Sequence, residues 1–79
     1  MSNSVDNLVR MANQIGDFFG TMKDRAQSLE EIAGHLRRFW EPRMRLALLA
    51  HVEQQDGVGL SDIVLESLRT HGESVIPAG

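Results

Sequence analysis

Apolar residues that recur every three or four positions constrain the fold of this chain more than any other feature. In the first quarter of the chain this spacing indicates one face of an amphipathic α-helix, formed by Val5, Leu8, Ala12, Ile15 and Phe19. Ser4 is placed to cap this helix and Gly20 to end it. Gly16, inside the helix, can allow a close approach to another helix. Because no alternating β-branched run occurs, the sequence predicts an all-α fold.

A second helix is expected after the polar and charged stretch 21–27, which we interpret as a linker. Ser28 and Glu31 match the capping box that often starts a helix. One face of this helix is apolar, through Leu29, Ile32, Ala33, Leu36, Phe39 and Trp40. Pro42 disfavours helical backbone at the residue before it but suits the first turn of a helix, so the chain should bend just before Pro42.

The remaining helices follow from the same signals. A third helix is expected over about 42–55, and its apolar residues spread over much of its circumference. The stretch 56–59 has two glycines and predicts a turn. Ser61 then caps a short fourth helix that ends at Gly72, and 73–79 is expected to be a frayed tail.

Together these elements predict a small bundle of three main helices with a short fourth C-terminal helix. We expect one helical domain over residues 1–79, ordered from about residue 4 to residue 72, with flexible termini. The expected core is Leu8, Ile15, Phe19, Ile32, Leu36, Phe39 and Leu48.

Several classes of function lack the residues they need. The chain has no cysteine, which excludes a thiol nucleophile and thiolate metal ligands and suits the cytoplasm. Its three histidines, His35, His51 and His71, lack the spacing of a metal site, and no glycine-rich phosphate loop opens a helix. We therefore expect no catalytic, cofactor or metal site. The formal net charge of -3 argues against nucleic acid as a partner, and neither a signal peptide nor a membrane-length apolar run is present.

The segment 35–45 is the part of the sequence whose residue types favour binding to a partner. It contains half of the basic residues and the only tryptophan, and its formal charge is +3 in a chain whose net charge is -3. No acid lies three or four positions before Arg37 or Arg38, so the usual helical ion pairs are mostly absent there. Arginine and tryptophan are enriched at interface hot spots. The expected partner-binding residues are His35, Arg37, Arg38, Trp40, Arg43 and Arg45.

A plainer interpretation of these residues stays open. The arginines can form a solvated basic face or pair with acids of the first helix and the linker, namely Asp6, Asp17 and Asp24. An aromatic pair on an apolar helix face, such as Phe39 and Trp40, is more often core than interface.

Two blocks of the sequence resemble a known family. One is Leu-Val-Arg-Met-Ala-Asn-Gln-Ile at 8–15, followed by two phenylalanines, and the other is His-Leu-Arg-Arg-Phe-Trp-Glu-Pro-Arg-Met-Arg at 35–45, followed by Leu-Leu-Ala-His at 48–51. Over roughly residues 5–70 the chain is similar to the delta subunit of the NAD-dependent, molybdenum-containing formate dehydrogenases. Asp62 departs from the pattern, because the family often has proline there.

The resemblance implies a non-catalytic accessory subunit that docks on the large alpha subunit and supports its assembly, stability or cofactor-loaded state. It places the molybdenum-pterin and iron-sulfur cofactors in the alpha subunit, and FMN and NAD in other subunits. Two alternatives remain: a small helix-turn-helix-like nucleic-acid binder that uses the bend at Pro42, and a helical protein that forms homo-oligomers.

Overall fold

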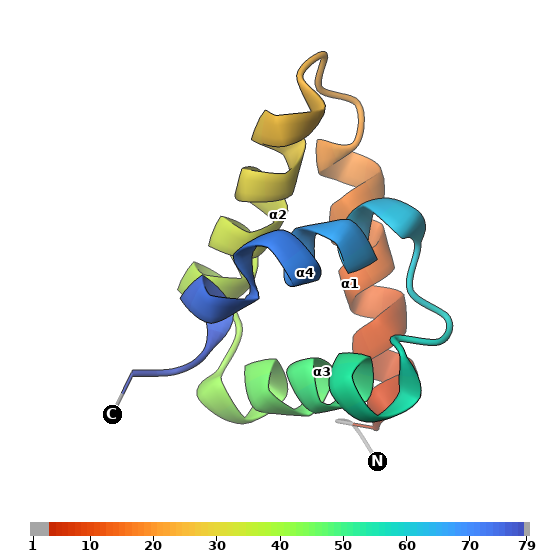
Figure 1. Ribbon diagram of the computed structural model, residues 1–79, viewed down its shortest axis with the longest axis vertical. Helices are drawn as coiled ribbons and strands as arrows, with labels where there is room; N and C mark the ends of the chain where they lie inside the picture. Colours follow the sequence, from red (N-terminus) through yellow and green to blue (C-terminus); the bar gives the residue numbers. More distant parts are fainter. Residues whose placement is uncertain (1–3, 79) are drawn as a thin grey trace.

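The computed structural model describes residues 4–78, and these fold into four α-helices without a strand (Figure 1). The helices are α1 (Val5–Phe19), α2 (Arg25–Phe39), α3 (Pro42–Gln55) and α4 (Asp62–Val75). The all-α prediction is confirmed, as are the limits of the third helix. The prediction of a short fourth helix is wrong, because α4 has 14 residues, as many as α3.

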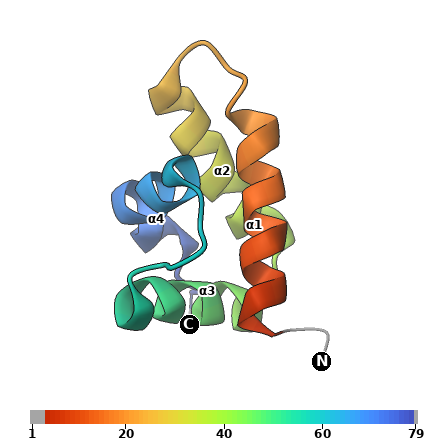
Figure 2. The same cartoon turned by 90° about the vertical axis from the view of Figure 1, so that its right-hand side faces the viewer.

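The helices pack around one core. α1 and α2 form an antiparallel hairpin, α4 lies across it, and α3 crosses the end where α1 begins (Figures 1 and 2). The most extensive contact joins α2 and α4. The buried core cluster draws on all four helices and consists of Leu8, Ala12, Ala33, Leu36, Trp40, Leu48, Val64, Leu68 and Val75.

The predicted core is confirmed at four positions, Leu8, Ile32, Leu36 and Leu48, which are all buried. Ile15 and Phe19 are only half-buried. The prediction that Phe39 belongs to the core is wrong, because 67% of its surface is exposed. Trp40, the C-cap of α2, occupies the buried position instead, with 6% of its surface exposed. Phe39, the residue before it, therefore points outward.

The second helix begins earlier than the capping box predicts. Asp24 is its N-cap and accepts a hydrogen bond from the Ala26 backbone N–H at 3.0 Å, which shortens the expected linker. Ser28 lies inside the helix, where its buried hydroxyl donates to the carbonyl of Phe19 at 2.7 Å. That bond satisfies a carbonyl at the end of α1, where no helical partner exists. Ser4 and Gly20 cap α1 as predicted.

The predicted bend at Pro42 is confirmed and is held by Arg45. Trp40 has extended backbone, and Pro42 is the first residue of α3. The Arg45 guanidinium donates from Nε to the carbonyl of Trp40 and from Nη1 to the carbonyl of Val75, both at 3.2 Å. One side chain therefore ties the bend to the end of α4.

The end of α4 corrects the predicted tail. The helix does not end at Gly72 but continues to Val75, whose side chain is completely buried. His71 departs from helical backbone, so α4 is kinked rather than ended at this point. The buried valine explains why the last turn is retained. The flexible ends expected at 1–3 and 79 lie outside the described residues.

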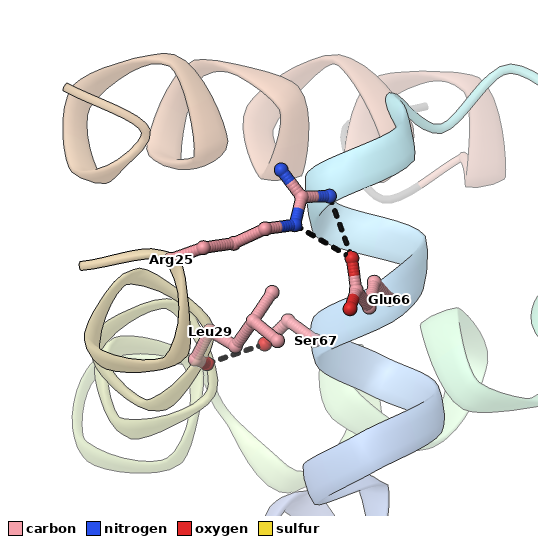
Figure 3. A network of polar contacts seen from close by, with 4 residues as sticks. All are labelled: Arg25, Leu29, Glu66 and Ser67. Atoms are coloured by element: carbon pink, nitrogen blue, oxygen red, sulfur yellow. Dashed lines mark hydrogen bonds and ion pairs between the residues drawn. The ribbon is translucent and has the colours of Figure 1, made fainter. Parts of the chain in front are cut away.

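Polar contacts reinforce the α2–α4 interface (Figure 3). The buried Ser67 hydroxyl donates to the carbonyl of Leu29 at 2.6 Å. Beside it, Nε and Nη2 of Arg25 donate to one carboxylate oxygen of Glu66 at 2.8 and 2.6 Å. Because both ionised side chains are about half exposed, this ion pair contributes at most about 1 kcal/mol.

Asn13 of α1 holds the predicted turn between α3 and α4. Asp56, Gly57 and Gly59 take positive φ there. The Asn13 side chain donates to the carbonyl of Gly59 at 3.0 Å and accepts from the backbone N–H of Ser61 at 2.8 Å. The N-cap position of Ser61 is confirmed, although its hydroxyl forms no capping bond. Nothing in the local sequence pattern pointed to this role of Asn13.

Candidate partner-binding groove

An apolar groove runs between α1 and the second half of α2. Its volume is about 490 Å³, and it is lined by Met11, Gln14, Ile15, Phe18, Phe19, His35 and Trp40. Trp40 closes it from the core side, whereas Phe18 stands at its edge with 71% of its surface exposed. The polar groups of the lining belong to Gln14, His35 and the indole N–H of Trp40. A depression of this composition suits apolar side chains.

Four aromatic rings contact one another in sequence, and we call them the aromatic strip: Phe18, Phe19, His35 and Phe39. The first three line the groove, whereas Phe39 lies beyond its lining, next to His35. Successive ring centroids are 4.9 Å, 5.9 Å and 4.7 Å apart. The first and last rings are largely exposed. Contiguous exposed apolar surface of this kind typically marks an interaction site in a small protein.

Two of the predicted partner-binding residues, His35 and Trp40, belong to the groove. His35 makes ring contacts with Phe19 and Phe39. Trp40 belongs to the buried core and also lines the groove. Its core position and its availability to a partner are therefore compatible.

Arg37 and Arg38 lie in the last turn of α2, and both are exposed. The Arg38 guanidinium stands 5.9 Å from the centroid of Phe39, within cation–π range. Among residues 4–78 neither arginine makes a hydrogen bond or an ion pair. Both lie at the C-terminal end of α2, where the negative end of the helix dipole stabilises cations.

The two arginines of α3 differ from each other. Arg43 is exposed in the first turn, with no ion pair in the described part of the chain. Arg45 is half-buried and committed to the carbonyls of Trp40 and Val75. Its role within the fold is therefore structural.

The pairing of these arginines with acids of the first helix and linker is not observed. Across residues 4–78 the ion pairs reduce to Arg25 with Glu66, and Asp24 serves as a helix cap. The exposed guanidiniums are solvated in the isolated chain.

Sequence reasoning missed the α1 wall of the groove, which consists of Met11, Gln14, Ile15, Phe18 and Phe19. The available signal was the width of the apolar arc on α1, which exceeds what one neighbouring helix can cover. The antiparallel packing of α1 and α2 turns that surplus toward the end of α2, and a local pattern does not show this pairing.

A second apolar depression, of about 450 Å³, lies between α3 and the end of α4 and is lined by Leu46, Leu49, Ala50, Val52, Glu53, Gly72 and Ile76. It has no aromatic ring in its lining. The aromatic strip and the neighbouring guanidiniums make the α1–α2 groove the stronger candidate for binding.

Other kinds of site find no support within residues 4–78. No group of three or more metal-ligating side chains gathers there. None of the described helices has the length and apolar character needed to cross a membrane.

Comparison with known proteins gives one result. Residues 7–68 match the family described as NADH-dependent formate dehydrogenase delta subunit, FdsD. The matched range holds every residue of the groove lining and the exposed arginines at the bend. Neither the curated proteins nor the solved structures gave a match.

Proposed function

Because the chain belongs to the family of delta subunits of NADH-dependent formate dehydrogenases, we propose that it is a non-catalytic accessory subunit that docks on the large, molybdenum-containing subunit. The observation that supports docking is the aromatic strip with its neighbouring unpaired arginines. Phe18, Phe39 and Arg38 of this surface are exposed in the isolated chain.

The energetics favour a partner. Fully burying one phenylalanine side chain is worth about 1.5–3 kcal/mol relative to leaving it exposed. Phe18 and Phe39 are 71% and 67% exposed, so most of that stabilisation is still available to a complex. A domain of this size has a free energy of unfolding of only about 4–12 kcal/mol. Docking therefore stabilises both the subunit and the surface it covers.

Within the complex we propose that the chain supports assembly, stability or the cofactor-loaded state of the large subunit in the cytoplasm. The molybdenum-pterin, iron-sulfur, FMN and NAD cofactors belong, in this proposal, to the partner subunits. The chain itself has no cysteine to hold an iron-sulfur cluster.

Co-purification tests this proposal. The large subunit, affinity-tagged, is purified from cells that contain or lack this chain, each grown with and without molybdate. We expect the chain to co-purify, and its absence to lower the yield or the molybdenum content of the large subunit. A large subunit that never retains the chain, and whose yield and molybdenum content do not depend on it, would contradict the proposal.

A further inference from the structure

The groove between α1 and α2 has one cationic end. Because the helices are antiparallel, the second turn of α1 lies at the same end as the last turn of α2 (Figures 1 and 2). Arg10 belongs to the first of these turns, and Arg37 and Arg38 to the second. Away from this end, Asp17 lies in the last turn of α1 and Glu31 in the middle of α2. Of these charged side chains, Arg38 lies beside the aromatic strip, through its contact with Phe39.

Within residues 4–78 no ion pair neutralises the arginines of the cationic end. Asp6 and Glu41 lie at this end, yet neither forms an ion pair with an arginine of residues 4–78. Arg10 donates to the side chain of Asn7, a neutral group. The guanidinium charge at this end is thus available to an external carboxylate.

Arg38 is placed beside the aromatic strip by the helix that carries it. Its guanidinium folds back over Gly34, where a Cβ atom would lie 3.1 Å from Nη1. The missing side chain leaves room for this conformation, which keeps the cation next to the ring of Phe39. Planar guanidinium donors in such a position suit a carboxylate.

Resting on the proposed function, we propose that the groove receives an amphipathic helix of the partner subunit, with large apolar side chains toward the groove and an aspartate or glutamate against Arg38. Both walls are helices whose backbone groups are bonded internally, so no sheet edge is present for an added strand. Recognition must then rely on side chains, as when an amphipathic helix fills a groove. Met11 in the lining adapts readily to such an occupant.

A second copy of this chain is the competing occupant, and cross-links from position 18 or 39 to a second copy would overturn the inference. Within residues 4–78 the large apolar side chains left exposed outside the aromatic strip are Val5, Leu46, Val58 and Ile76, and of these Leu46 and Ile76 line the depression between α3 and the end of α4. The apolar faces of α2 and α4 are already buried against each other.

Cross-linking in the assembled complex tests the identity of the occupant. The photoreactive residue p-benzoylphenylalanine is placed at position 18 or 39, and at position 58 as a control, since Val58 is equally exposed but lies in the α3–α4 turn. The cross-linked partner segment is mapped by mass spectrometry. Arg38→Glu is then measured for affinity, alone and with the mapped carboxylate changed to arginine.

We expect positions 18 and 39 to map to one amphipathic helix of the partner with a carboxylate near position 39, and position 58 not to reach it. Arg38→Glu should weaken binding by at least about tenfold, and the reciprocal change in the partner should restore it. A mapped segment without a carboxylate, a failed rescue, or co-purification without groove cross-links would each overturn the inference while leaving the accessory role intact. Loss of co-purification by the unmodified chain would instead refute the proposed function.

Discussion

Two glycines inside helices should respond in opposite directions to the same substitution. Gly16 lies where α1 approaches α4, and a Cβ atom there would be 2.5 Å from Cγ2 of Val64 and 3.3 Å from Cγ2 of Ile63. Val64 is completely buried and β-branched, so it has almost no alternative rotamer within a helix. At Gly34 the nearest atoms all belong to the flexible and exposed side chain of Arg38.

The intrinsic gain in helix propensity is the same at both sites, about 0.8–1.0 kcal/mol for Gly→Ala. Gly34→Ala should therefore raise the free energy of unfolding by up to about 1 kcal/mol. Gly16→Ala adds the cost of overpacking a filled core, about 1–3 kcal/mol, because α1 and α4 must separate. The difference between the two variants equals that cost, so Gly16→Ala should melt at least about 4 °C below Gly34→Ala.

Thermal unfolding followed by circular dichroism measures this difference, with helicity at low temperature as the fold control. If Gly16→Ala is as stable as Gly34→Ala, the close approach of α1 to α4 described above is wrong. A loss of stability in Gly34→Ala would show instead that the Arg38 side chain contributes to the fold.

Three further predictions concern the core, the α3–α4 turn and catalysis. Leu36→Ala should lower the free energy of unfolding by about 2–5 kcal/mol, because this side chain is completely buried, and unchanged melting would contradict its placement. Asn13→Leu should lower the free energy of unfolding, measured by chemical denaturation, by about 1–3 kcal/mol, because it removes the side chain that bonds Gly59 and Ser61 in the α3–α4 turn. A change below about 0.5 kcal/mol would show that water replaces the amide. The purified chain should not oxidise formate with NAD or a dye acceptor in a spectrophotometric assay, and turnover free of the large subunit would contradict the accessory role.

The sequence predicts the helices of this chain better than it predicts their ends. The limits of α3 follow from Pro42 and the glycine-containing turn, because both act through local backbone preferences. The predicted start of α2 was wrong, because Asp24 and Ser28 are both residue types that cap helices well. Asp24 is the cap in the structure, and the Ser28 hydroxyl instead bonds the carbonyl of Phe19 in α1. The last turn of α4 was missed, because only the buried contact of Val75 retains it.

The candidate site was predicted in part for the same reason. Local pattern marked Arg37 and Arg38 as cations without helical partners, and the structure agrees within residues 4–78. It did not show that Arg45 would be committed to two carbonyls, one of them 30 positions away in the chain. Nor did it show that Phe39, rather than Trp40, would be the exposed ring of the pair. These outcomes depend on which helices meet.

The affinity of the large subunit for the double variant Arg38→Glu, Arg43→Glu tests the central claim of docking most directly. Both side chains are exposed and unpaired within the described residues, so reversal should leave helicity unchanged. The matched control is Lys23→Glu, Arg69→Glu, which changes the net charge equally at exposed positions of the α1–α2 turn and of α4. Loss of a desolvated charge pair costs about 2–5 kcal/mol, so the first variant should bind at least about 30-fold more weakly than the control. Equal affinities with unchanged circular dichroism would place the docking surface elsewhere, and unfolding of the first variant would show that these arginines serve the fold.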